Sequence, residues 1–171
     1  MIPTLYGREE DTLFLHGAVA SRLMKQMATG TPVCITVTHV DGLVLARSAF
    51  HHSMNYRSVV LFGTAVAVDA EDKEHALFVL SEQVIPGRWA EVRGPAPKEL
   101  AATSVAKFTI ETASAKIRTG PPVDEDEDYE LPIWAGVVPM NHSYQAPIAD
   151  ERLLPTIELP PSLRKLASSQ R

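Results

Sequence analysis

The sequence of 171 residues predicts a mainly β protein, a small antiparallel β-barrel covered by helices. Stretches in which apolar and polar residues alternate outnumber stretches with helical spacing. The turns between them are short enough for antiparallel pairing. With 45% hydrophobic and 22% charged residues, the composition is that of an ordinary globular domain.

The first thirty positions predict a β-hairpin followed by a short helix. Apolar and β-prone residues flank a polar turn at residues 7–11, which is typical of a hairpin. Apolar side chains then recur every four positions over residues 18–27, so that one face of a helix is apolar. Gly30 stands where a C-terminal cap is expected.

The next segment predicts two strands joined by a tight turn. Residues 33–40 alternate in polarity, as a strand with one buried face does. Asp41 and Gly42 then form a dipeptide that strongly favours a two-residue turn. We therefore expect residues 43–47 to pair back against the preceding strand.

A loop over residues 48–56 precedes the longest β-prone run, residues 57–69. Gly63 in its middle indicates a bend or a close approach of another backbone. Residues 69–87 predict a helix, with acidic residues in its first turn and Pro-Gly at its end. In the strand predicted over residues 103–120, the apolar side chains occupy even positions at first and odd positions later, so the apolar face changes side midway. This change of parity predicts a bulge or a strand shared between two sheets.

Charge and cysteine content exclude several classes of protein. The net charge of -5 and scattered basic residues argue against nonspecific nucleic-acid binding. No apolar stretch is long enough to cross a bilayer, and no signal peptide is recognisable, so no membrane partner is expected. The lone cysteine, Cys34, predicts a reducing compartment, the cytoplasm, and a buried thiol. The acidic run at residues 124–130 predicts a solvated loop.

The chain offers no convincing metal site. His51 and His52 are adjacent, and neighbouring side chains of an extended chain point to opposite sides. His39 lies on the predicted strand before them, but no cysteine pair or carboxylate cluster accompanies these histidines. We expect no bound metal.

The corner between the hairpin and the first helix predicts an anion site. Gly17 lets a ligand approach the backbone closely. Ser21 can donate a hydroxyl hydrogen bond, and the guanidinium of Arg22 matches two phosphate oxygens at once. Without further support this signal is weak, because a Ser-Arg pair on a helix is more often a solvated surface pair with no ligand.

Three segments extend this pattern: IPTLYGREEDTLFLHGAVASR, VDGLVLARSAFHHSMNYRSVVLFGTA and LPIWAGVVPM. In this order they resemble the flavin-nucleotide-binding branch of the pyridoxamine 5'-phosphate oxidase-like family, which includes nitroimidazole-resistance proteins. The resemblance runs from Ile2 to Met140. It implies an FMN-binding split β-barrel, antiparallel and Greek-key-like, with two or three covering helices. It also implies a homodimer that binds FMN at the subunit interface, with the barrel domain at residues 1–145 and a Pro-rich extension at 146–171.

The resemblance also implies the site residues by position. The backbone at the start of the chain would line the isoalloxazine, and a His-Gly pair would approach the ring or the ribityl chain. The corner would bind the phosphate, two residues of the long central strand would line the flavin pocket, and a tryptophan would reach the flavin from the partner subunit. In chain order these are Ile2, Pro3, Thr4, His16, Gly17, Ser21, Arg22, Arg57, Ser58 and Trp134.

The chain departs from the family in two ways. Relatives usually carry a helix and a strand before the segment that begins here at Ile2, which predicts an unpaired sheet edge beside the flavin. The C-terminal Arg and Trp signature of true pyridoxamine 5'-phosphate oxidases is not evident. We therefore expect an FMN-dependent oxidoreductase with an unknown small-molecule substrate and no assignable catalytic residue. The alternatives are a non-catalytic flavin carrier or sensor, and a barrel that has lost its ligand.

Overall fold

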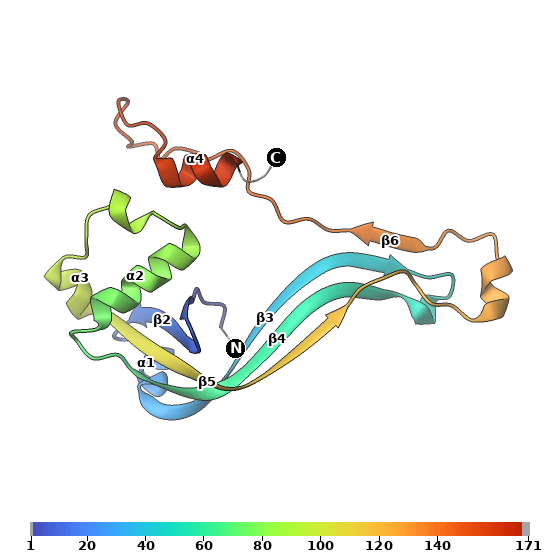
Figure 1. Cartoon of the computed structure of the whole chain (residues 1–171), viewed down its shortest axis with the longest axis horizontal. Helices are drawn as coiled ribbons and strands as arrows, with labels where there is room; N and C mark the ends of the chain where they lie inside the picture. Colours follow the sequence, from blue (N-terminus) through green and yellow to red (C-terminus); the bar gives the residue numbers. More distant parts are fainter. Residues whose placement is uncertain (1, 169–171) are drawn as a thin grey trace. The chain divides into compact units, whose positions relative to one another are not determined.

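A computed structural model describes residues 2–168 and confirms a mainly β fold. Six strands form one antiparallel sheet in the order β1-β2-β5-β4-β3-β6 (Figure 1). The strands are β1 Gly7–Glu9, β2 Thr12–Ala18, β3 Thr29–Leu45, β4 Ser53–Ala67, β5 Thr103–Arg118 and β6 Gly136–Pro139. The helices are α1 Arg22–Met27, α2 Lys73–Val84, α3 Pro97–Ala102 and α4 Pro161–Ser168, with 3-10 turns at Ala49–His51, Trp89–Glu91 and Asp126–Glu130.

The described chain forms two compact units. Unit 1 comprises residues 2–33, 62–111 and 144–168, and unit 2 comprises residues 34–61 and 112–143. Strands β3, β4 and β5 each run through both units. The α-helices α1 to α4 all belong to unit 1.

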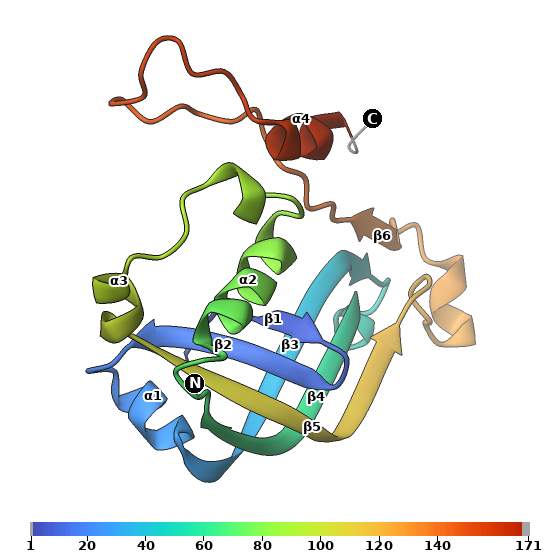
Figure 2. The same ribbon diagram turned by 60° about the vertical axis from the view of Figure 1, so that its left-hand side comes forward.

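The core of unit 1 lies under α2, which packs against β1 and β2 (Figure 2). Its cluster of buried side chains is Phe14, Ala76, Val79, Leu80 and Val105. The backbone of Gly7 lies so close to α2 that a Cβ there would stand 2.6 Å from the Leu80 nitrogen. The predicted helix over residues 69–87 is confirmed as α2, and it covers one face of the hairpin.

The predicted hairpin is present, but its first strand lies later than expected. β1 occupies Gly7–Glu9, within the predicted turn, and the reversal falls at Glu10, whose φ is 50°. β1 pairs with β2 and forms one edge of the sheet. The helix prediction was also too long, because Ala18 ends β2 and Ser21 caps the N-terminus of α1.

The tight turn predicted at Asp41 and Gly42 is wrong, because β3 runs straight through both residues. Asp41 accepts two hydrogen bonds of 2.9 Å from the guanidinium of Arg57. Gly42 faces β6, where a Cβ would stand 3.0 Å from the Val138 carbonyl oxygen. The dipeptide thus serves an ion pair and a close strand contact, both of which need residues distant in sequence.

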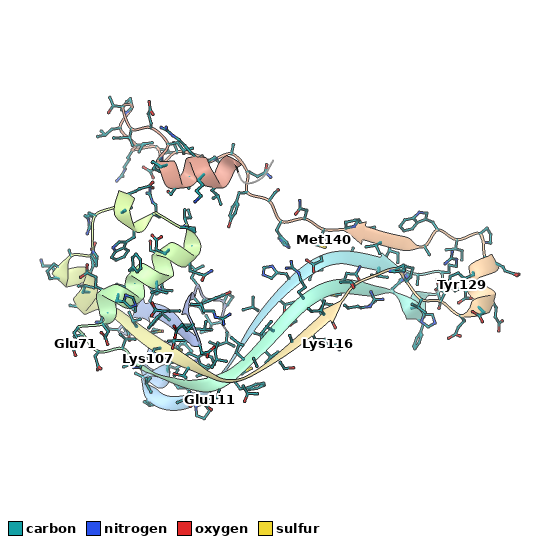
Figure 3. The ribbon with its side chains drawn as sticks, viewed as in Figure 1. Glu71, Lys107, Glu111, Lys116, Tyr129 and Met140 are labelled. Carbon is teal, nitrogen blue, oxygen red and sulfur yellow. The ribbon has the colours of Figure 1, made fainter. Side chains whose placement is uncertain are left out.

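Gly63 of β4 confirms the predicted close approach. A Cβ at this position would stand 1.9 Å from the carbonyl oxygen of Thr109 on β5. β5 remains within a single sheet, so the parity change does not mark passage into a second one. It does fall near the boundary of the units at Glu111, and β5 is exposed from there to Ile117. Glu111 and Lys116 are labelled in Figure 3.

The acidic run is not uniformly solvated, because Asp124 is only 7% exposed. One of its carboxylate oxygens accepts the backbone N–H groups of Arg47 at 2.9 Å and of Ser48 at 3.2 Å, and the other accepts the Arg47 side chain at 3.2 Å. The Arg47 guanidinium also lies 4.8 Å from the ring centroid of Tyr129, labelled in Figure 3. Asp124 therefore anchors this loop to the end of β3.

Acid is expected to destabilise the fold between about pH 4.5 and pH 2. Hydrogen bonds from Arg93 lower the pKa of Glu99 from 4.5 to about 2. Burial raises the pKa of Asp124, but the N–H groups of Ser48 and Arg47 outweigh it and hold that pKa below 3.8. Because a lowered folded-state pKa stabilises only the ionised form, this contribution is complete above the ordinary pKa and is lost as pH falls through the folded value.

Urea unfolding midpoints measured from pH 7 down to pH 2 test this expectation. Glu99→Gln should flatten the lower part of the profile, and added salt should weaken the effect because Glu99 is half exposed. A midpoint that stays constant below pH 4.5 would contradict it.

The Cys34 side chain is exposed, not buried as expected. Residues 146–160 contain no strand, and α4 follows them, with the Ser162 backbone N–H donating to Glu91 at 2.8 Å. Within the described chain, no helix is long and apolar enough to cross a bilayer.

Candidate functional site

The predicted corner forms where β2 ends and α1 begins. Gly17 packs against α1, since a Cβ there would stand 2.9 Å from Met24 Cγ. The Ser21 oxygen accepts the Met24 N–H at 3.4 Å, which leaves its own hydroxyl hydrogen available to a ligand. The side chain of Arg22 is exposed, and its guanidinium makes no hydrogen bond or ion pair with another described residue. Three predicted residues are thus brought together with free hydrogen-bond donors.

His16, the residue before Gly17, lines a pocket of unit 1. The pocket has a volume of about 450 Å³. Most of its wall is apolar, and its polar members are a histidine, a serine and an ion pair. The lining residues are Leu5, His16, Leu77, Leu80, Ser81, Val84, Trp89, Arg93, Pro95 and Glu99.

The charged residues of the pocket form an ion pair. Arg93 donates to both carboxylate oxygens of Glu99, which also accepts the backbone N–H of Ala96 at 2.7 Å. This bond from Ala96 caps the first turn of α3. The carboxylate therefore stays ionised and keeps the guanidinium beside an otherwise apolar cavity.

The wall formed by Trp89 is held in place by its neighbours. Its backbone N–H donates to Glu82 of α2 at 3.0 Å. Its ring meets the ring of Phe78 edge to face, with 5.9 Å between centroids. An aromatic wall fixed in this way can contact a flat ligand without first losing side-chain freedom.

The predicted residues at the start of the chain lie outside this pocket. Ile2, Pro3 and Thr4 are exposed and precede β1. The Thr4 hydroxyl donates to the carbonyl of Leu5 at 3.2 Å, and Leu5 is the first residue of the chain that lines the pocket. The structure thus places this segment beside a pocket residue.

The other three predicted residues belong to unit 2. Arg57 is paired with Asp41, and the Ser58 hydroxyl lies 2.7 Å from that of Thr38. Trp134 is 66% exposed, and its ring passes over Gly136. Arg57 is thus already neutralised by a carboxylate, a partner that sequence reasoning missed.

Sequence reasoning also missed the pocket itself. The apolar spacing of Leu77, Leu80 and Val84 identified one face of a helix, but that spacing is equally typical of a closed core. Trp89 carried no signal that distinguished it from a buried aromatic residue. Only the packing of α2 beside His16 shows that this face lines a cavity.

Two solved structures match almost the whole chain. The FAD and heme binding protein from Mycobacterium smegmatis is 40% identical, with a TM-score of 0.92 over 96% of this chain and 82% of that one. The flavocytochrome Anf3 from Azotobacter vinelandii is 42% identical, with a TM-score of 0.89 over 96% of this chain and 77% of that one. This chain is therefore similar to both in sequence and in fold.

A more distant match shows the fold alone. It is a putative 5-nitroimidazole antibiotic resistance protein from Bacteroides thetaiotaomicron, 22% identical, with a TM-score of 0.52 over 67% of this chain and 66% of that one.

Among curated proteins, none matches the chain significantly. The family model described as pyridoxamine 5'-phosphate oxidase matches residues 1–117, more than half of the sequence. The predicted resemblance is thereby confirmed, and the chain belongs to the pyridoxamine 5'-phosphate oxidase family.

Proposed function

We propose that this protein binds a flavin nucleotide and acts as an oxidoreductase on a small molecule. The observation that carries the proposal is the corner formed by Gly17, Ser21 and Arg22. A hydroxyl donor and an exposed guanidinium there suit a phosphate group of a flavin nucleotide. α1 has only six residues, so these two side chains matter more than the helix dipole.

The donor set fits a flavin phosphate, and the remaining contacts are proposed from the family resemblance. Ile2, Pro3 and Thr4 would line the isoalloxazine ring, Arg57 and Ser58 would line the flavin pocket, and the tryptophan at position 134 would reach the flavin from the partner subunit. When bound, the flavin supplies the redox chemistry. The residues of this chain bind its phosphate, orient the ring and exclude water.

The flavin is proposed to be FAD in preference to FMN. The resemblance in sequence implied FMN, but the M. smegmatis relative, 40% identical over 96% of this chain, is named for FAD. Titration of the cofactor-free protein with each nucleotide, followed by flavin fluorescence, distinguishes them. Tighter binding of FMN would support the original expectation, and no binding of either would end the proposal.

A haem is proposed as a second cofactor. Two relatives with 40% or higher identity are named as haem proteins, one of them as a flavocytochrome. The observation in this chain that favours a haem is a histidine in the wall of an apolar pocket. A flavin and a haem together would let the protein divide the electron pair of a small-molecule donor into single electrons.

Visible spectra test these proposals directly. The purified protein is expected to show oxidised-flavin absorption, which anaerobic reduced nicotinamide cofactor should bleach. If the flavin stays oxidised when reduced nicotinamide cofactor is added, a carrier or sensor role is supported instead. A colourless protein that gains no flavin on reconstitution would support a barrel that has lost its ligand.

We also propose that the protein is a homodimer in the cytoplasm, the compartment indicated by its lone cysteine. The strands and loops of unit 2 expose many large apolar side chains, more than a solvated surface needs. They include Leu43, Val59, Ile117, Val123, Leu131, Ile133, Trp134, Val138 and Met140. A second copy packed against unit 2 would bury part of this apolar surface.

Ile117→Glu tests the dimer. Ile117 is 66% exposed in the single chain, so a charge there should not disturb the fold of a protomer. It should, however, place an unpaired carboxylate in the interface. Analytical ultracentrifugation is expected to give twice the 18.7 kDa chain mass for the parent protein and a shift towards one chain for the variant, with unchanged circular dichroism. A parent protein that sediments as a monomer would contradict the proposal.

A further inference from the structure

We propose that the pocket beside α2 is the haem site and that His16 is an axial ligand of the iron. This inference rests on the proposed function, in which the chain carries a haem. It goes further by naming the cavity, the ligand and the residues that hold the macrocycle. It also moves His16 from the flavin ring, where the family resemblance places it, to the iron.

His16 is suited to this role by its position on β2. It pairs in register with Val105 of β5, so the strand holds its backbone in place. Phe14, two residues earlier on the same face, packs into the core under α2. The imidazole therefore projects on the α2 side of the sheet, where it lines the pocket. It is the one imidazole among the described residues that line this cavity.

Other histidines are occupied or lie elsewhere. His75 of α2 is bound to Glu9, with its Nε2 3.1 Å from a carboxylate oxygen. His52 uses its Nδ1 to accept the backbone N–H of Ala46 at 2.9 Å. No such bond to a described residue engages His16. The remaining three, which belong to unit 2 and not to the pocket, are His39, His51 and His142.

The pocket also suits the rest of a haem. Its volume of about 450 Å³ is within the range of cofactor pockets, roughly 300–1,000 Å³. Leu77, Leu80 and Val84 of α2 present an apolar wall to a porphyrin face, and the fixed ring of Trp89 adds a flat one. Because the porphyrin nitrogens supply the equatorial ligands, the protein needs to provide only an axial one.

Arg93 supplies the charge that a haem edge requires. A haem carries two propionates, and a guanidinium can bind a carboxylate through two hydrogen bonds. Arg93 lies at the pocket but is now paired with Glu99. Since both side chains are at least half exposed, exchange of one carboxylate partner for another costs little. Arg93 would thus hold the propionate edge at the mouth.

The same strand would contribute to both cofactor sites, through consecutive residues that face opposite sides. His16 faces the α2 side of β2, and Gly17, the next residue, packs against α1 at the proposed phosphate corner. The ligand of the iron and the backbone at the flavin phosphate are then consecutive residues. This adjacency is a direct structural reason for one small chain to hold both groups.

Haemin titration of the cofactor-free protein tests the inference by absorption and magnetic circular dichroism. The parent protein should bind haemin with a Soret band typical of histidine ligation. His16→Gly should weaken binding by at least about tenfold, and added imidazole should restore the histidine-type spectrum. The matched control is His39→Gly, a histidine on β3 outside the pocket, which should leave the spectrum unchanged.

A second pair of variants fills the pocket without touching the ligand. Val84→Trp should reduce haem binding, because Val84 lines the cavity, and Gln83→Trp, an exposed neighbour outside it, should not. A parent protein that binds no haemin would refute the haem part of the proposed function. A parent that binds haemin while His16→Gly and Val84→Trp leave its spectrum and affinity unchanged would refute this inference alone. Loss of flavin binding instead of haem binding in Val84→Trp would also overturn it, since the pocket would then hold the flavin.

Discussion

Gly63→Ala is expected to lower the free energy of unfolding by at least about 3 kcal/mol, the upper range for overpacking. β4 and β5 approach so closely here that a Cβ would stand 1.9 Å from the Thr109 carbonyl oxygen and 3.1 Å from the ring of Phe108. The oxygen belongs to the backbone, so it cannot move aside as the end of a side chain can. Phe108 is fully buried, which leaves the ring no room either. The two strands must separate, and their hydrogen bonds and the core below must be disturbed.

Urea denaturation at pH 7 measures this effect, with Gly94→Ala as the control. The nearest atom to a Cβ at Gly94 is a Glu74 carboxylate oxygen at 4.0 Å, so the methyl group has space there. The control should be neutral or slightly stabilising, because alanine restricts the unfolded chain. Equal stability of the parent and Gly63→Ala would mean that the strands do not lie as close as the structure places them.

Arg22→Ala is expected to weaken flavin binding by about 1.5–3 kcal/mol, the scale of a hydrogen bond to a charged group. This corresponds to a dissociation constant about 10 to 150 times higher. The proposed reason is that the guanidinium binds two phosphate oxygens at once, a geometry that no other side chain of the corner reproduces. Because the side chain is exposed in the free protein, its removal should leave the stability of the fold almost unchanged.

Fluorescence titration with FAD and FMN measures the loss, and Lys25→Ala is the matched control. Lys25 is an exposed base in the last turn of the same helix. Both variants lower the net charge equally, so a difference between them separates a direct phosphate contact from a general electrostatic effect. The loss should also appear with FMN, which carries the phosphate, and be absent with riboflavin, which does not. If Arg22→Ala binds flavin as tightly as Lys25→Ala does, Arg22 does not belong to the site.

Local features of the fold could be predicted well. α2 was recognisable because its apolar residues repeat at helical spacing and its ends carry the appropriate signals. Gly63 was recognisable as a close approach because a glycine within a long β-prone run is otherwise unfavourable. The Asp41-Gly42 dipeptide misled because the same pair that favours a turn also suits an ion pair and a tight strand contact. Only the partners, distant in sequence, decide between these uses.

In the candidate site, too, residues close together in the sequence could be predicted, and residues that only folding brings together could not. Gly17, Ser21 and Arg22 lie within six positions, so the end of one element and the start of the next bring them together without help from the rest of the chain. The family resemblance covered the same corner, and the family is confirmed. The pocket, in contrast, combines Leu5 and His16 with residues of α2 and the segment around Trp89, more distant in the sequence. No local pattern marks such a set.

The buried carboxylate of Asp124 is the clearest case. In sequence it begins an acidic run that repulsion should keep in water, and the rest of that run is indeed largely exposed. Its burial depends on the backbone N–H groups of Arg47 and Ser48 and on the Arg47 guanidinium, 76 to 77 residues away. A charge is removed from water only where hydrogen-bond donors compensate it, and these donors come from another part of the chain.

By itself, then, the sequence determined the β-rich class, the long helix, the family and the corner formed by Gly17, Ser21 and Arg22, because each depends on periodicity or on residues close along the chain. The tertiary structure alone decided the path of β3, the burial of Asp124 and the pocket beside His16. These depend on backbone approach, charge compensation and packing between distant segments, and such interactions exist only after the chain has folded.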